Sequence, residues 1–384
     1  MSLLVLSAAD VREVVSSFST TFLQELMRQV FITVSRTASS TTGGIPDIQT
    51  PHRTAIEMAS HTTLFMPARV FSDKPRLEGT SIKVVSVPRQ EGDIRGLPAT
   101  TLVLNEETGA VDAVINAREL TALRNAAGSL LSTTLVGIHK PQRIVLFGAG
   151  KQIEAHLSVF LKHYPSIKFC TLVNRNLNER ALDLFKTAIA TFPRVTFHLF
   201  PGQDRDSIQN SVSSADIIVC ATSAASPLFP SSWVPSGTHV VLVGSYKPHM
   251  QEVEEALVQR AIPTIRPTAS QRISQALIVD SREACIKEAG DLIKAGVGEE
   301  SMLEIGELLQ DEGQSLTELA PGSHSNPGNH LTQTTEVCDF EGPITMFKSV
   351  GIGLQDVVMA KEVVSHAKTH RHVGTLVGRY DAPF

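Results

Sequence analysis

The sequence lacks the features that mark a membrane protein, a secreted protein or a nucleic-acid-binding protein. It has no apolar run of about 18 residues, the minimum for a membrane-spanning helix. The first ten residues carry no basic leader, and their apolar run is too short for a signal peptide. The net charge is −5, and no basic cluster with interleaved aromatic residues occurs. We therefore expect a cytoplasmic protein that binds neither membrane nor nucleic acid.

Metal-binding and hydrolase motifs are also absent. The cysteines are few and scattered, which predicts buried, reduced thiols rather than metal ligands: Cys170, Cys220, Cys285 and Cys338. His366, His370 and His372 lie close in sequence, but no acidic residue or cysteine joins them, so a solvated tail is expected and no metal site. No Gly-x-Ser-x-Gly motif occurs, which disfavours a serine hydrolase.

What is present is the pattern of a large two-domain α/β protein. The 384 residues can bury a sizeable core, and residues 141–280 alternate strand-like and helix-like segments, as in a parallel doubly wound sheet. We predict a Rossmann domain over 136–344, with a surface insertion at 321–336. A discontinuous α+β catalytic and dimerisation domain is expected from 1–135 together with 345–384.

The local patterns of the first domain predict a long helix, a loop and a set of strands. A cap at 7–10 precedes helical spacing of apolar residues. The expected elements are a helix at 11–30, a loop at 39–54, strands at 62–66, 81–87 and 100–105, and helices at 117–135 and 353–367.

A glycine turn between a buried strand and a helix is the most informative local feature. The run from Arg143 to Gln152 reads Arg-Ile-Val-Leu-Phe-Gly-Ala-Gly-Lys-Gln. Gly148 permits the tight turn, and Gly150 lets a diphosphate approach the backbone at a helix N-terminus. The resulting cradle would comprise Gly148, Ala149, Gly150 and Gln152. Ile153 occupies the third fingerprint position, where glycine or alanine is usual.

The next strand carries the signal for cofactor choice. It ends in Asn174, Arg175 and Asn176, where NAD-binding units usually have an acidic residue for the ribose 2′-hydroxyl. A guanidinium there can bind a 2′-phosphate, so NADPH is favoured over NADH. A later strand ends in Thr222 and Ser223, small hydroxyl residues expected near the nicotinamide.

Motifs along the whole chain form an ordered series, which those of the N-terminal half complete. They are Pro51-His-Arg-Thr54, Phe65-Met-Pro-Ala68, Ser81-Ile-Lys-Val-Val-Ser86, Leu120-Thr-Ala-Leu-Arg-Asn-Ala-Ala127, Gly148-Ala-Gly-Lys-Gln152 and Phe347-Lys-Ser-Val-Gly351. In this order they resemble the ornithine cyclodeaminase/mu-crystallin family from near residue 7 to about residue 367. The resemblance implies an NAD(P)-dependent enzyme acting on the Cα–N bond of amino or imino acids, usually a homodimer formed through the N-terminal domain.

The resemblance also assigns roles to single residues. Arg53, Lys83 and Arg124 match the substrate-binding and catalytic positions. Two arginines can clamp a substrate carboxylate, and a lysine in an apolar strand is costly unless it lies at a sheet edge or serves a site. Thr100 and Ser349 match cofactor-contacting positions, and Met66 and Tyr246 are assigned to the substrate pocket.

One departure from the family pattern bears on the reaction. Gly244-Ser-Tyr-Lys-Pro248 replaces the Gly-x-Asp-x-Pro pattern of the cyclodeaminases, so Tyr246 stands where they have a catalytic aspartate. A phenol is a poor base at neutral pH. The Asn174-Arg175 pair also matches the ketimine reductases. We therefore favour an NADPH-dependent reductase of imino acids. Two alternatives are a redox-neutral cyclodeaminase with bound NAD and an NADPH-binding sensor without turnover.

Overall fold

The structure is a computed structural model that describes residues 2–37, 41–42, 45–71, 77–89, 96–265, 273–309, 340–370 and 372–381. The chain forms two compact units. Unit 1 comprises Met1–Ala127 with Gly351–Phe384, and unit 2 comprises Gly128–Val350. The predicted insertion at 321–336 and Cys338 lie outside the described residues.

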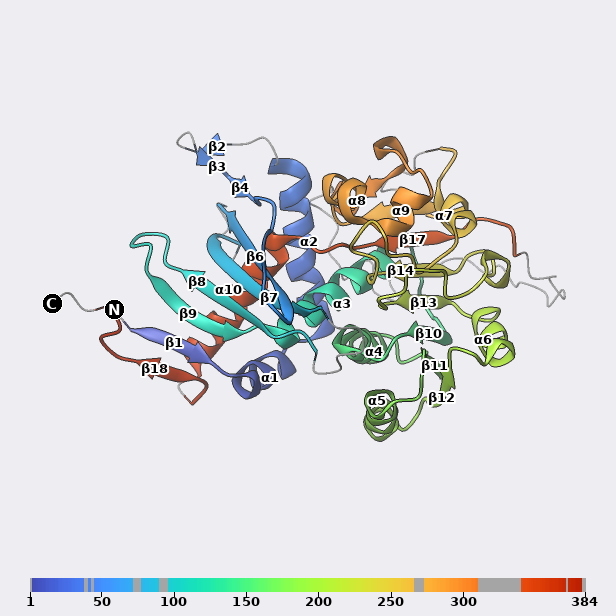
Figure 1. Cartoon of the computed structure of the whole chain (residues 1–384), viewed down its shortest axis with the longest axis horizontal. Coiled ribbons are helices and arrows are strands. Elements are labelled where there is room, and N and C mark those ends of the chain that lie inside the picture. The colour runs from blue at the N-terminus through green and yellow to red at the C-terminus, as the bar shows by residue number, and fades with distance from the viewer. Residues whose placement is uncertain are drawn as a thin grey trace, which may run out of the picture. The chain divides into compact units, whose positions relative to one another are not determined.

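Unit 2 contains a parallel doubly wound sheet (Figure 1). Its strand order is β12-β11-β10-β13-β14-β17-β15-β16, and every pairing in it is parallel. The strands are β10 (Arg143–Phe147), β11 (Phe169–Asn174), β12 (Thr196–Pro201), β13 (Ile217–Cys220), β14 (His239–Leu242), β15 (Ala276–Val279), β16 (Leu303–Glu304) and β17 (Thr345–Lys348). The predicted α/β fold class with a Rossmann sheet is confirmed.

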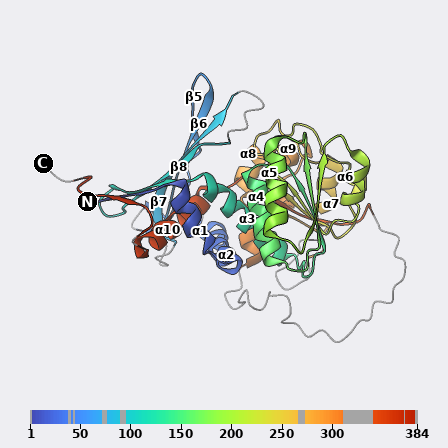
Figure 2. The same ribbon diagram turned by 90° about the horizontal axis from the view of Figure 1, so that it is seen from below.

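Helices cover both faces of this sheet. Figure 2 shows α4 and α5 on one face and α6 and α7 on the other. Parallel strands buried on both faces become uninterrupted apolar runs, and β13, β14 and β15 are buried throughout. The helices are α4 (Lys151–His163), α5 (Glu179–Thr191), α6 (Arg205–Val212), α7 (Glu255–Ala261), α8 (Arg282–Glu288) and α9 (Gly290–Lys294), with short 3₁₀ turns at Ser231–Trp233, Glu299–Ser301 and Ile305–Leu309.

The strand order reverses between β10 and β13. The chain runs outward from β10 to β12 and then crosses back to β13 on the other side of β10. In open α/β sheets this switch point is where ligands bind, beyond the carboxyl ends of the strands. The glycine turn after β10 lies at this point.

Unit 1 is built on a mostly antiparallel sheet with the order β18-β1-β9-β8-β7-β6-β4, and β5 also pairs with β6. The strands are β1 (Leu3–Leu6), β4 (Ile48–Gln49), β5 (Thr54–Glu57), β6 (His61–Val70), β7 (Gly79–Pro88), β8 (Ala99–Leu104), β9 (Val111–Asn116) and β18 (Thr375–Val377), with β2 (Thr41–Thr42) and β3 (Ile45–Pro46) forming a separate pair. The helices are α1 (Ala8–Ser16), α2 (Thr20–Thr37), α10 (Gly353–Thr369) and the first part of α3 (Arg118–Leu135).

The sheet of unit 1 has one buried face, which α10 packs against at β6, β7 and β8 (Figure 1). Burial alternates along the strands: Ala99, Thr101 and Val103 are buried, whereas Thr100 and Leu102 are half-buried. This period of two is that of a strand with one face on the core. The buried face therefore carries the residues that α10 can contact.

Four sequence predictions require correction. The loop expected at 39–54 contains the short strands β2, β3 and β4. The helix expected at 11–30 is two helices, because Ser19 accepts a hydrogen bond from the Phe22 N–H and starts α2 after a break. The division of the chain falls at 127/128 and 350/351 rather than at 135/136 and 344/345. The second boundary moves because β17 pairs with β14 and β15 inside the parallel sheet.

Two other findings concern cysteines and membrane spans. Cys170, Cys220 and Cys285 are buried free thiols, and burial raises the pKa of each. Within the described part of the chain, no helix combines the length and apolar character needed to cross a membrane.

Candidate active site

Lys83 lies in the middle of β7 on the buried face of the unit 1 sheet. Only 3% of its surface is exposed. Met66 on β6 and Thr101 on β8 are its direct cross-strand neighbours. A lysine at such a position must bury its ammonium group, which is unfavourable unless a partner compensates for lost hydration.

Asp356 is that partner, and sequence reasoning missed it. Its Oδ2 accepts a hydrogen bond from Lys83 Nζ at 2.5 Å, and its Oδ1 accepts one from Arg124 Nε at 3.1 Å. Asp356 lies in the first turn of α10, where the helix dipole favours a negative charge. One carboxylate thus joins β7, α3 and α10.

Arg124 is held on several sides. Its Nη1 donates to Gln355 Oε1 at 2.8 Å and also to Asn125 Oδ1. Gly351 lies against the guanidinium, and a Cβ there would be 2.6 Å from Nη1. With φ of +84°, Gly351 adopts a conformation that disfavours other residues as well. The glycine before α10 is therefore required by the position of Arg124.

The pKa values of the cluster reflect burial and neighbouring charges. Burial lowers the pKa of Lys83 to about 8; Arg124 and Arg53 act in the same direction, and Asp356 opposes them. Burial alone would raise the pKa of Asp356, but Arg124 and Lys83 outweigh it and the pKa is lowered. Asp356 is therefore ionised at neutral pH, whereas Lys83 titrates near neutrality.

The cluster carries more positive than negative charge. Lys83 and Arg124 both form their ion pairs, among the described residues, with Asp356. Two buried cations sharing one carboxylate leave one positive charge in excess. Arg53, half-buried in the segment before β5, adds a further positive charge close enough to affect Lys83. A carboxylate ligand is the kind of group that such a site stabilises.

Thr100 lies on the other face of the sheet. It pairs with Val84, the residue after Lys83, so its side chain points away from the cluster. The structure therefore places Thr101, not Thr100, beside Lys83. The cofactor contact expected of Thr100 is left as a prediction.

In unit 2 the glycine turn has the geometry that a tight strand-to-helix connection needs. Gly148 has φ of +116°, and a Cβ there would lie 2.9 Å from the Ala221 oxygen. Ile153 is fully buried, with its Cγ1 3.2 Å from the same hypothetical Cβ. The isoleucine at the third fingerprint position thus packs beneath the turn and fills the space between α4 and β10.

The start of α4 fits a dinucleotide diphosphate. Gly150 is the N-cap residue and makes no side-chain capping bond, so the first N–H groups of the helix have no side-chain acceptor there. A Cβ on Gly150 would meet nothing within 4 Å, which leaves open space in front of the backbone. Gln152 Oε1 is buried and has no hydrogen-bond partner among the described residues. The uncapped helix start and the open space before Gly150 match an anion site at a helix N-terminus, whereas Gln152 Oε1 is an acceptor and offers an anion no hydrogen bond.

The end of β11 has the predicted polar residues. Asn174 donates through Nδ2 to the Asn176 oxygen at 2.7 Å, which shapes the turn. Arg175 is exposed and forms no ion pair with a described residue. Gly202 directly follows β12 and lies beside Arg175: a Cβ added to Gly202 would be 3.4 Å from the Arg175 Cα. The guanidinium is thus available at the position expected for the adenosine ribose.

A buried polar network lies at the carboxyl ends of β13, β14, β15 and β17. Glu252, Asp280, Asp291 and Lys348 are each at most 1% exposed. Thr222 donates to Glu252, and Ser349 donates to Asp280 at 2.7 Å. Ser223 is exposed and Tyr246 is half-buried. The predicted cofactor residues Thr222 and Ser349 are therefore bonded to acidic residues that sequence reasoning did not identify.

Burial raises the pKa of Glu252 to about 7, and Asp291 adds to the effect while Lys348 opposes it. Lys348 Nζ donates to Ser245 Oγ at 3.0 Å and lies 3.6 Å from Asp291. An isolated buried carboxylate would be unfavourable, so the network depends on its hydrogen bonds.

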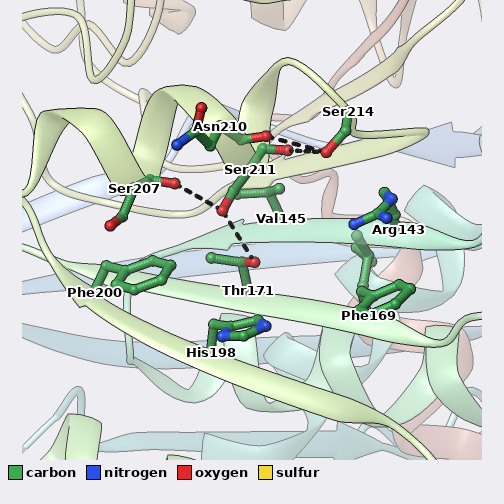
Figure 3. A pocket seen from close by; sticks show the side chains of 11 residues that line it. Arg143, Val145, Phe169, Thr171, His198, Phe200, Ser207, Asn210, Ser211 and Ser214 are labelled. Carbon is green, nitrogen blue, oxygen red and sulfur yellow. Dashed lines mark hydrogen bonds between the residues drawn. The ribbon is translucent and has the colours of Figure 1, made fainter.

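A separate pocket of about 270 Å³ lies between α6 and the strands β10, β11 and β12 (Figure 3). The Arg143 guanidinium lies 4.2 Å from the centre of the Phe169 ring, and Ser211 Oγ donates to the Ser207 oxygen. No residue of the predicted site lines this pocket. Its hydroxyl groups bond within the pocket wall: Thr171 donates to Ser211 Oγ at 3.4 Å, and Ser214 donates to the Asn210 oxygen at 3.1 Å.

The chain resembles known proteins along most of its length. A model of the ornithine cyclodeaminase/mu-crystallin family matches residues 8–305. Ketimine reductase mu-crystallin of Mus musculus is 26% identical, over 82% of this chain and 84% of that protein. The structure of Thermococcus litoralis delta(1)-pyrroline-2-carboxylate reductase in complex with NADH and L-proline has a TM-score of 0.72 at 22% identity, covering 97% of this chain and 99% of that one. An archaeal alanine dehydrogenase dimer with bound NAD has a TM-score of 0.71 at 19% identity, covering 99% and 100%.

The shared carboxylate can be tested through stability. Replacing Asp356 by alanine leaves two buried cations without a counter-charge, so the free energy of unfolding should fall by about 3–5 kcal/mol. Glu106→Ala is the control, because Glu106 pairs with the partly exposed Arg69 in the same sheet and should cost below about 1 kcal/mol. Urea unfolding of both variants measures this. Equal losses would contradict a special role for the buried carboxylate.

Substitution of the two glycines of the turn should affect different properties: Gly148→Ala should affect stability, and Gly150→Ala should affect NADPH binding. Gly148→Ala meets the Ala221 oxygen at positive φ and should lower the free energy of unfolding by more than about 1 kcal/mol. Gly150→Ala has room and should cost less than about 1 kcal/mol, yet it should weaken NADPH binding about tenfold or more, because its Cβ occupies the approach to the backbone. Urea unfolding and fluorescence titration separate the two effects. Unchanged NADPH binding by Gly150→Ala would exclude the cradle.

Proposed function

The chain belongs to the ornithine cyclodeaminase/mu-crystallin family, and on that premise we propose that it reduces the C=N bond of an imino acid with NADPH to give the amino acid. The observation that carries this proposal is the buried Lys83–Asp356–Arg124 cluster with its excess positive charge. The name of the mouse relative, a ketimine reductase, supports the same type of reaction.

In the proposed complex the substrate carboxylate completes the charge balance of the cluster. Arg124 is oriented by Asp356 and Gln355 before any ligand arrives, so little side-chain freedom is lost on binding. Arg53 supplies a second guanidinium for the same carboxylate. Met66, directly across from Lys83, contributes an apolar wall for the carbon skeleton.

Lys83 is proposed to orient the substrate and to donate the proton taken up at the imine nitrogen. Its pKa of about 8 suits this role, because the ammonium form predominates at neutral pH and can still release its proton. Asp356, bonded to Nζ at 2.5 Å, holds the ammonium group in place.

The cofactor residues are those of the switch point in unit 2. The helix α4 N-terminus with Gly148, Ala149 and Gly150 is proposed to hold the diphosphate, and Arg175 the 2′-phosphate. The bound reduced nicotinamide supplies the hydride that Cα receives. Ser223 and Ser349 are proposed to lie near the nicotinamide half.

The position of Tyr246 favours reduction over cyclodeamination. It follows β14 at the carboxyl edge of the sheet, half-buried, with Lys247 Nζ 5.8 Å from its ring centre. A phenol next to a cation does not supply the carboxylate base that cyclisation of a diamino acid needs.

Cofactor preference can be tested at Arg175. In the unmodified protein NADPH should bind more tightly than NADH. Arg175→Ala should weaken NADPH binding by roughly ten- to a hundredfold and so remove most of this preference. Arg180→Ala, on the exposed start of α5, is the control and should keep the preference. Fluorescence titration with each cofactor measures this. Tighter binding of NADH by the unmodified protein would refute the assignment.

The reaction itself is tested by a paired assay. With a cyclic imino acid the protein should oxidise NADPH, and with L-ornithine it should release neither ammonia nor proline. Lys83→Ala should lower kcat/KM for imine reduction about a hundredfold or more, with NADPH affinity nearly unchanged. Proline formation by the unmodified protein would instead identify a cyclodeaminase, and NADPH binding without turnover of any imine would identify a sensor.

The pH profile gives an independent readout of Lys83. Only the ammonium form can donate, so kcat/KM for reduction should fall as pH rises through about 8. The residual activity of Lys83→Ala should lack this decline, which distinguishes it from titration of the substrate. A decline that persists in the variant would remove Lys83 from the proton transfer.

A homodimer is proposed through the sheet of unit 1. The face opposite Lys83 carries two cross-strand rows of half-buried residues, mostly apolar: Phe65, Val84 and Thr100, then Pro67, Ile82, Leu102 and Val114. Covering such a face with its two-fold copy would remove apolar surface from water. Light scattering at micromolar concentration should give twice the chain mass of 41.5 kDa. Ile82→Lys should give a monomer, and a monomeric unmodified protein would contradict the proposal.

A further inference from the structure

One buried carboxylate joins the ends of two neighbouring strands of the parallel sheet. Glu252 Oε1 accepts hydrogen bonds from the Thr222 N–H at 2.6 Å and the Thr222 hydroxyl at 2.8 Å. Its Oε2 accepts one from the Gly244 N–H at 2.7 Å. Thr222 follows β13 and Gly244 follows β14, so the carboxylate bridges the two segments that leave the sheet at the switch-point side.

The backbone of Glu252 is held by Asp291. Asp291 Oδ1 accepts the N–H of Glu252 at 2.7 Å and that of Val253 at 3.2 Å. The other oxygen of Asp291 accepts the hydroxyl of Ser245. Glu252 is 0% exposed, so the position of its carboxylate is determined by these bonds and not by solvent.

The bridged segments approach more closely than side chains would permit. A Cβ on Gly244 would lie 2.1 Å from the Thr222 oxygen and 2.4 Å from Glu252 Oε1. The adjoining Ala221 oxygen lies close to Gly148, and the Ala221 N–H donates to the Phe147 oxygen. The glycine turn, residues 221–223 and residues 243–246 therefore lie next to one another at the ends of β10, β13 and β14.

The chemistry of the bridge requires an acceptor on both oxygens. The three bonded groups are all donors, and only an ionised carboxylate presents acceptors alone. Burial raises the pKa of Glu252 to about 7, so the bridge is complete at pH values above that pKa. A glutamine of the same size would turn an NH₂ group toward at least one donor, and an unmade bond to a buried backbone N–H is costly. Glu252→Gln is thus a small change that opens the bridge on one side.

We propose that Glu252 is a positioning residue whose carboxylate holds the ends of β13 and β14 as the surface against which the nicotinamide half of the cofactor lies. This inference rests on the proposed function for the presence of that cofactor. Glu252 touches neither cofactor nor substrate in this account, and acts through Thr222 and through the Gly244–Tyr246 segment.

The test compares the whole cofactor with a fragment that lacks nicotinamide. NADPH and 2′-phospho-ADP-ribose are titrated into the unmodified protein and Glu252→Gln at a pH above the Glu252 pKa of about 7, where its carboxylate is ionised. Binding is followed by calorimetry. Glu252→Gln should bind NADPH about tenfold more weakly and the fragment within about twofold of the unmodified protein. Glu254→Gln is the matched control, because Glu254 also accepts a backbone N–H, that of Ser231 at 2.7 Å, outside the bridge. It should leave both affinities within about twofold.

Two results would overturn the inference: unchanged NADPH affinity in Glu252→Gln, or equal loss of NADPH and fragment, which would indicate a role in folding alone. If Glu252→Gln does not fold, Thr222→Val decides, since it removes the hydroxyl that donates to Glu252 and accepts the Ala224 N–H at 3.3 Å, and leaves the backbone N–H of Thr222 in place. Thr222→Val should weaken the binding of NADPH and leave the binding of the fragment unchanged. An unchanged NADPH affinity would refute the role of the bridge. Because the readout is binding, absence of imine turnover by the unmodified protein would refute the proposed function without altering this result.

Discussion

The ionised, buried Asp356 is the group on which unit 1 depends. Its two oxygens bind cations from β7 and α3, and it stands in the first turn of α10, so one carboxylate connects the sheet with two helices. Buried ion pairs contribute little net stability compared with apolar packing. Here they place two cations beside one anion in a largely dry environment, which prepares the site for a second carboxylate.

In unit 2, buried acidic residues compensate buried backbone N–H groups, as Asp356 compensates buried cations in unit 1. Glu252, Asp291 and Asp280 accept N–H and hydroxyl donors at the carboxyl ends of the strands, where the chain leaves the sheet and regular ladder bonds stop. Buried donors there need acceptors, and buried acids supply them. The result is a set of rigid strand ends at the switch point, where an α/β sheet binds its ligand.

The sequence predicted the parts of this structure that local patterns determine. The glycine turn, the strand ending in Asn174 and Arg175, and the parallel sheet follow from apolar runs and glycine spacing, and the family and fold class were confirmed. Asp356 was missed because its partners are 232 and 273 residues away in sequence. A signal existed, since it interrupts an apolar helical run. Glu252 gave no such signal, because its role depends on two backbone N–H groups that no side-chain pattern reveals.

In the proposed function the Lys83–Asp356–Arg124 cluster recognises a carboxylate. The most direct measurement is calorimetric titration with pyrrole-2-carboxylate, a planar and unreactive analogue of a cyclic imino acid, and with its neutral carboxamide, in the presence of NADPH. The carboxylate should bind about a hundredfold or more tightly than the carboxamide, because charge-assisted hydrogen bonds to Arg124 and Arg53 are lost with the charge. Equal affinities for the two compounds would contradict it.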